Sequence, residues 1–394
     1  MTQGYSVDIP DRMVNRGEAR RRFGDEFVER MGDWLTRTDP LADELVAATR
    51  GWPRVRLLRT VERAIRRGID AVEEAPEPLE ALVEQVVTVP AWVDRERVDR
   101  GGAFFLSTHI LGGLVLGGKS LIAGYAAPAG NKPLVLSGRL RRGTNRRLAE
   151  TSRFVYDVSN PGGLEAAGDG VVSAVTVRLI HAQVRDMIER KVDWNDDWGA
   201  PINQHDMMAT LLLFSVVWLE GIETLGVIPT EREADDVIAL WRYVGYLMGV
   251  DPELLPATRQ EAERFASFIA LTQGPPDEDS RELTRAFMSA GPSEEAGDRG
   301  AVHRQTLGCA LVRTLLGDDL ADELGVPDSP WSNAIPVVGQ LARPLNAVRQ
   351  IPGGARAATD IGHRYWQWVL QNNPAGLVDL TIPEELFGLR REAA

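Results

Sequence analysis

Cysteine is almost absent from this chain of 394 residues, which contains only Cys309. One cysteine cannot form an intrachain disulfide, and this composition is typical of proteins that work in a reducing compartment. It also excludes zinc and iron–sulfur sites built from several thiolates, and covalent haem attachment through a CxxCH motif. The surrounding sequence, TLGCALVRTLLG, has the pattern of an apolar helix face, so we expect Cys309 to be a packing residue.

An excess of positive charge is missing as well. The chain has 44 Lys and Arg against 57 Asp and Glu, which gives a formal net charge of -13. Nucleic acids are bound by basic surfaces, so we expect no nucleic-acid partner. Arginines do cluster at 20–22 and at 139–142, and the simplest interpretation of both runs is a solvated helix face.

Long hydrophobic runs are scarce. The first 27 residues, MTQGYSVDIPDRMVNRGEARRRFGDEF, contain no apolar core of a secretory signal. The stretch from Gly101 to Gly118 is uncharged over about the length of a membrane span, but its glycines, Ser107, Thr108 and His109 favour a tightly packed interior helix. We therefore expect no stable membrane insertion and a cytoplasmic location.

Alternating strand patterns and local catalytic motifs are also missing. No HExxH, phosphate-binding loop, dinucleotide fingerprint or nucleophile elbow occurs. Apolar residues instead recur at helical spacing between proline and glycine breaks, which predicts an all-α fold. We divide this single large helical domain into an N-terminal extension (1–25), a core (26–272) and a C-terminal helical extension packed on the core (273–394).

One predicted helix, Val171 to Lys191, carries a histidine within its apolar stripe. Residues three and four apart share a helix face, which puts Arg178 and Arg185 beside His181. A buried imidazole and buried guanidiniums need polar partners. Two interpretations stay open at this point: a core histidine bonded to a carbonyl with arginines reaching the surface, or a cofactor such as haem, which takes both an imidazole and cations.

The sequence of this helix, VRLIHAQVR, resembles the signature of the latex-clearing-protein and MpaB-type oxygenase family, also called domain of unknown function 2236. Further blocks keep the family's order along the chain: DPLADELVAAT from Asp39, VPAWVD from Val89, GRLRRGTNRRLAETSRFVYDV from Gly138, GAPINQHDMMATLLLF from Gly199 and WRYVGYLMGV from Trp241. The resemblance implies an all-helical fold with a globin-like core and a bound haem b. It makes His181 the iron ligand, with Arg185 and Arg178 as the residues that support the haem.

The same resemblance implies an oxygen-binding side formed by Arg147 and Thr151, four residues apart on one predicted helix. Rubber-cleaving relatives carry a lysine directly before this threonine, where it can occupy the sixth coordination position of the iron. Here the position is Glu150, which could leave the iron open or could pair with Arg146 or Arg147. A glutamate described as a base in those relatives has no convincing match between Tyr125 and Gly138, which puts polymer cleavage in doubt.

These observations lead us to expect a haem-dependent oxidoreductase, an oxygenase that uses dioxygen on a hydrophobic alkene- or prenyl-containing small molecule. Oxidative cleavage of a C=C bond is one outcome of this chemistry. A haem peroxygenase or monooxygenase that tailors a natural product is an alternative, and so is a non-catalytic haem-binding or gas-sensing protein. A family member that has lost its haem and binds a lipid is a third.

Overall fold

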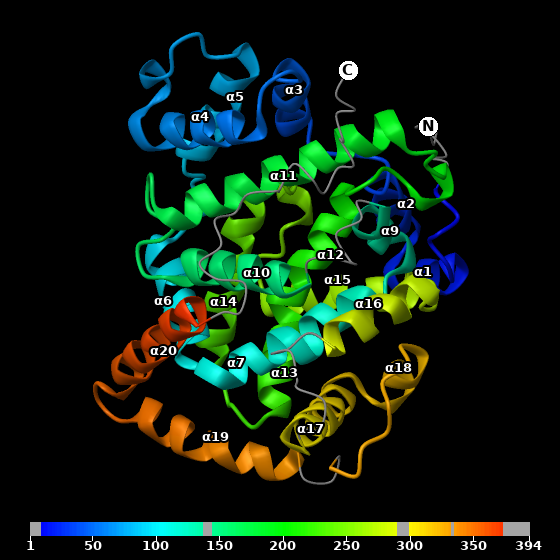
Figure 1. Ribbon diagram of the computed structural model, residues 1–394, viewed down its shortest axis with the longest axis vertical. Coiled ribbons are helices and arrows are strands. Elements are labelled where there is room, and N and C mark those ends of the chain that lie inside the picture. The colour runs from blue at the N-terminus through cyan, green and yellow to red at the C-terminus, as the bar shows by residue number, and fades with distance from the viewer. Residues whose placement is uncertain (1–8, 137–143, 290–298, 332–334, 373–394) are drawn as a thin grey trace.

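The computed structural model describes residues 9–136, 144–289, 299–331 and 335–372, and every regular element in these ranges is a helix (Figure 1). The first half contains α1 (Arg16–Phe23), α2 (Asp25–Asp33), α3 (Pro40–Ala48), α4 (Arg54–Arg67), η1 (Ile69–Ala71), α5 (Glu77–Val87), α6 (Arg95–Ser107), α7 (His109–Val115), η2 (Leu116–Leu121), α8 (Ile122–Tyr125), α9 (Pro128–Leu136), α10 (Thr144–Ser159), α11 (Asp169–Lys191) and η3 (Asp196–Trp198). The second half contains α12 (Gln204–Phe214), α13 (Val216–Thr224), α14 (Glu231–Leu247), η4 (Pro252–Leu254), α15 (Arg259–Thr272), α16 (Glu278–Met288), α17 (Arg299–Leu316), α18 (Asp318–Glu323), α19 (Ile335–Gln350) and α20 (Gly354–Gln371). The all-α prediction is confirmed.

Helix α11 crosses the upper half of the molecule, with α3, α4 and α5 on one side of it and α10 and α14 on the other (Figure 1). Asp39 caps α3 and Pro40 occupies its first turn, as their order in the sequence predicts. The C-terminal helices lie along the lower edge, where α20 packs on α6 and α17 packs on η2.

The centre of the core is built from large aromatic side chains. The rings of Phe105 and Trp218 stack with centroids 3.9 Å apart, and those of Phe214 and Trp241 stack at 4.9 Å. Helices α6 and α14 approach closely because Gly101 has no side chain: a Cβ there would lie 2.2 Å from the carbonyl oxygen of Asp236. Burial of these apolar surfaces supplies the main favourable term in folding.

The glycine-rich stretch from Gly101 to Gly118 is not one helix. The chain bends by 91° between α6 and the segment that begins with α7, and His109 at the bend has a left-handed φ of 42°. The helical path then opens into a π-helical turn at η2. Both sides of the bend contribute buried side chains to the core, including Phe105 and Val115. The predicted interior location is observed, with two packed helices in place of one.

A second apolar helix predicted from Asn203 to Leu225 is also divided. Asn203 caps α12 by accepting a hydrogen bond from the Asp206 amide, but the backbone breaks at Ser215 before α13 begins. Together Gln204–Thr224 is long and apolar enough to cross a membrane by length and composition alone, and 56% of its most apolar window is buried inside the molecule. Partial burial of this kind is common for a helix in the core of a helical domain.

Candidate functional site

A large cavity of about 1490 Å³ lies between α8, α9, α10, α11, α12 and the C-terminal end of α15. Apolar side chains form most of its wall, including Phe154 from α10, Val177 from α11, Leu213 from α12 and Ile269 from α15. Ligand pockets commonly have volumes of about 300–1,000 Å³, so this cavity has room for more than one ligand.

The predicted iron ligand, His181, is on the wall of this cavity. It lies midway along α11 beside Val177, Ile180 and Val184, which also line the cavity. These four residues recur at the three- and four-residue spacing of one helix face. Helix α11, which has 23 residues, therefore presents the His181 imidazole to a largely apolar cavity.

Helix α10 brings the predicted oxygen-side residues to the same cavity. Arg147, Glu150, Thr151 and Phe154 all line it, again at helical spacing. Glu150 accepts a hydrogen bond from Arg146 at 2.9 Å, so its carboxylate is paired with one of the two arginines considered from the sequence. Arg147 forms no ion pair with a carboxylate of the described residues. Its guanidinium can therefore serve an anionic or electron-rich ligand.

Arg178 and Arg185 have a different environment from the one the sequence suggested. Arg178 is 1% exposed and donates two hydrogen bonds to the Asp39 carboxylate, at 2.6 and 2.8 Å. Arg185 is equally buried and bonds Asp43 at 2.7 Å. Neither lines the cavity. Both guanidiniums already have carboxylate partners on α3, so their predicted role as haem-supporting residues gains no support from their position.

The helical repeat explains this division. A step of about 100° per residue puts Arg178 and Arg185 about 40–60° to one side of His181, and Val177 and Val184 the same angle to the other. The two arginines therefore face α3, whereas the two valines face the cavity. The signal for this arrangement was present in DPLADELVAAT, which places two aspartates four residues apart on one helix face.

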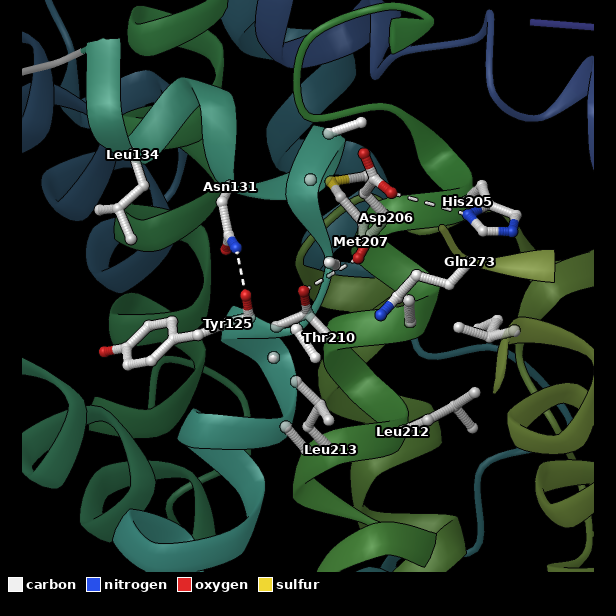
Figure 2. Close-up of a pocket in the computed structure, with 18 of the residues that line it drawn as sticks. Tyr125, Asn131, Leu134, His205, Asp206, Met207, Thr210, Leu212, Leu213 and Gln273 are labelled. Carbon is white, nitrogen blue, oxygen red and sulfur yellow. Dashed lines mark hydrogen bonds and ion pairs between the residues drawn. The ribbon is translucent and has the colours of Figure 1, made fainter. Parts of the chain in front are cut away.

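A second group of polar residues in the cavity was not found from the sequence. Figure 2 shows Asn131, Thr210 and Gln273 projecting among the apolar side chains of Met207, Leu212 and Leu213. They come from α9, from α12 and from the residue that follows α15. Sequence reasoning missed them because no motif joins three segments so far apart in the chain.

The other polar candidates of the sequence lie away from the cavity. His109 is packed against α20, and burial lowers the pKa of its imidazole despite a hydrogen bond with the backbone of Ala358. Cys309 is buried in a small apolar cluster, and burial raises the pKa of its thiol. Among the described residues, no group of three or more His, Cys, Asp or Glu side chains is arranged to hold a metal ion. His205 lines the cavity as His181 does, but its Nδ1 lies 3.6 Å from the Asp206 carboxylate.

Comparison with known proteins agrees with this arrangement. Residues 107–348 match the family described as "ER-bound oxygenase mpaB/B'/Rubber oxygenase, catalytic domain". A rubber oxygenase from Streptomyces sp. (strain K30) is 26% identical over 263 residues, which are 65% of this chain and 62% of that relative. The solved structure of latex clearing protein LCP in the closed state has a TM-score of 0.67 and 22% identity, and the match covers 85% of this chain and 91% of that one.

The chain spans less than two thirds of the length of the rubber oxygenase, and the family match runs past the boundary that we predicted at residue 272. The structural likeness extends over most of both chains and shows a shared fold. The family match covers more than half of this chain, including α10 and the histidine helix α11. The chain therefore belongs to the MpaB and rubber oxygenase catalytic-domain family.

Proposed function

We propose that the protein is a haem b-dependent oxygenase that acts on a hydrophobic alkene- or prenyl-containing small molecule. The observation that carries the proposal is the position of His181 on the wall of a largely apolar cavity, together with Arg147 and Thr151. The description of the matched family names oxygenases, which supports the same reaction class.

The residues present fit a haem in three respects. The cavity of about 1490 Å³ is larger than a usual single-ligand pocket, which leaves space for a macrocycle and a substrate. His181 supplies the imidazole that haem iron takes as an axial ligand. Arg147 supplies a cavity-facing cation with no carboxylate partner among the described residues.

Each of these side chains has a definite task under this proposal. His181 would hold the iron, and the apolar wall from α11 and α12 would bind the alkene and exclude water. On the α10 side of the cavity, Thr151 can donate a hydrogen bond and Arg147 can stabilise negative charge. Bound haem would supply the dioxygen chemistry itself.

Glu150 distinguishes this chain from the rubber-cleaving relatives described above. Because Glu150 pairs with Arg146, it neutralises a neighbouring cation and offers no amine to the iron. We base the substrate class on the apolar lining of the cavity and not on Glu150.

The test is the visible spectrum of full-length protein produced with a haem precursor. The expected result is a Soret band that survives purification and is lost in His181→Ala. His363→Ala is the matched control, because His363 lies on α20 away from the cavity. A colourless wild-type protein, or a His181→Ala spectrum identical to that of the control, would refute the proposal.

Oxygenase activity needs its own measurement. Haem-loaded protein would be incubated with prenyl compounds under ¹⁸O₂, and the products would be analysed by mass spectrometry. Incorporation of labelled oxygen supports the proposed activity. Haem binding with no oxygenated product from any prenyl substrate would contradict the catalytic part of the proposal and would favour a non-catalytic haem protein.

A further inference from the structure

The part of the cavity between α9, α12 and the end of α15 contains three uncharged polar side chains, Asn131, Thr210 and Gln273 (Figure 2). Polar groups are placed sparingly in apolar ligand pockets, where they fix the orientation and identity of the ligand. We infer that these three residues bind a neutral hydroxyl group of the substrate. The inference rests on the proposed function and specifies its substrate class.

Short contacts hold the three elements together at this point. A Cβ on Gly130, next to Asn131, would lie 3.6 Å from Asp206 Oδ1 on α12. Thr210 donates a hydrogen bond from its hydroxyl to the Asp206 carbonyl oxygen at 2.9 Å. Gln273 directly follows α15, which packs on α12, and Figure 2 shows its side chain beside Thr210. The three side chains therefore belong to one region of the cavity.

The charged groups around this region neutralise one another. Arg12 forms two hydrogen bonds with the Asp206 carboxylate, at 2.7 and 2.8 Å. Burial alone would raise the pKa of Asp206, but the Arg12 guanidinium and the neighbouring His205 together hold it well below its usual range. Lys132 pairs with Asp277 at 2.7 Å and also with Asp279. Within the described residues, this end of the cavity offers no unpaired cation to a carboxylate or phosphate, so it disfavours an anionic ligand.

The remaining hydrogen-bonding capacity includes both donors and acceptors. Asn131 donates one Nδ2 proton to the Tyr125 carbonyl oxygen at 2.6 Å, which leaves its second Nδ2 proton as a donor and its Oδ1 as an acceptor. The Thr210 hydroxyl has used its proton on Asp206, so its oxygen can only accept. Gln273 adds an amide that both donates and accepts.

A hydroxyl group matches this set best. It donates one hydrogen bond to Asn131 or Thr210 and accepts one from the Gln273 amide, whereas an ether or a ketone has no proton to donate. A pure hydrocarbon would leave the polar groups of the cavity without partners, which costs binding energy. The expected substrate is thus an alkene or prenyl chain that ends in a neutral hydroxyl group.

The test compares geraniol, its methyl ether and geranyl phosphate as ligands of the full-length purified chain, with dissociation constants from isothermal titration calorimetry. We expect geraniol to bind most tightly. Gln273→Leu and Thr210→Val should each weaken geraniol binding by about threefold to tenfold, the range expected for one lost hydrogen bond. Thr210→Val should hardly change ether binding, because an ether has no proton to donate to Thr210, whereas Gln273→Leu should weaken alcohol and ether binding alike. Thr224→Val is the matched control, because Thr224 makes the same hydrogen bond to a carbonyl oxygen four residues earlier but lies away from the cavity.

The outcomes separate this inference from the proposed function. Equal binding of alcohol and ether by the wild type, or tightest binding of the phosphate, would overturn the inference even in a protein that binds haem and oxygenates alkenes. A preference for geraniol over the ether that persists unchanged in Thr210→Val would overturn it too. A preference that Thr210→Val loses, in a protein without a Soret band, would support the hydroxyl site and refute the haem oxygenase. Circular dichroism of each variant verifies that the fold is kept.

Discussion

Removal of Asp39 should destabilise the protein strongly, because Asp39 is the carboxylate partner of a fully buried arginine. The side chains of Arg178 and Asp39 are only 2% and 3% exposed, and they share two hydrogen bonds of 2.6 and 2.8 Å. Deleting one partner of such a pair leaves the other charge buried without compensation, which costs about 3–5 kcal/mol. Asp39 also caps α3, and losing a cap costs about 1 kcal/mol.

We therefore expect Asp39→Ala to lower the free energy of unfolding by about 4 kcal/mol, measured by urea denaturation at neutral pH. The control is Glu62→Ala, which removes an exposed ion pair with Arg66 and should cost at most about 1 kcal/mol. Adding Arg178→Met to Asp39→Ala should restore part of the loss, because the unpaired charge is removed. If Asp39→Ala costs no more than Glu62→Ala, the structural role assigned to Arg178 is wrong.

Three further predictions follow from the site and the core. Glu150→Lys should alter the visible spectrum of haem-loaded protein, since an amine then reaches the cavity wall, whereas Glu150→Gln should leave it unchanged. Gly101→Ala should lower the free energy of unfolding by about 1–3 kcal/mol through a clash with a carbonyl oxygen of α14, whereas Gly17→Ala, which has space, should be neutral or slightly stabilising. For Glu233, burial raises the pKa, but the hydrogen bonds from Arg349 and Thr230 and the Arg349 charge together outweigh it, so the net pKa is lowered. Its stabilising contribution is present above its unfolded-state pKa and is lost as the pH falls through the folded-state pKa, so Glu233→Gln should flatten the acid side of a plot of melting temperature against pH.

Helical periodicity predicted the all-helical fold and which residues share a face of each helix. Spacings of three and four put Arg147, Glu150 and Thr151 on one face of α10, but periodicity alone left open whether His181 is a core residue. It was the family resemblance that implied one site for His181 and the α10 residues, and both sets line the same cavity.

Features that depend on packing between distant segments could not be predicted. Arg178 and Asp39 are 139 residues apart in the chain, and only the docking of α3 on α11 brings them together. The helix breaks at His109 and Ser215 could not be predicted from a nearby proline, because there is none. The bend at His109 is held by buried neighbours on both sides, so the breaks are decided by tertiary contacts that override a continuous apolar pattern.

The division of α11 between two neighbours explains how one helix can serve both stability and chemistry. The ion pairs to α3 fix its rotation about its own axis, because each guanidinium must reach its carboxylate. That rotation in turn sets which residues face the cavity, and His181 is the first polar residue beyond the arginines on that side. A rotation of α11 large enough to turn His181 away from the cavity would break both buried pairs. The two arginines therefore position the imidazole from outside the cavity, and in HAQVR the one-turn spacing of His181 and Arg185 lets one helix face α3 and the cavity at once.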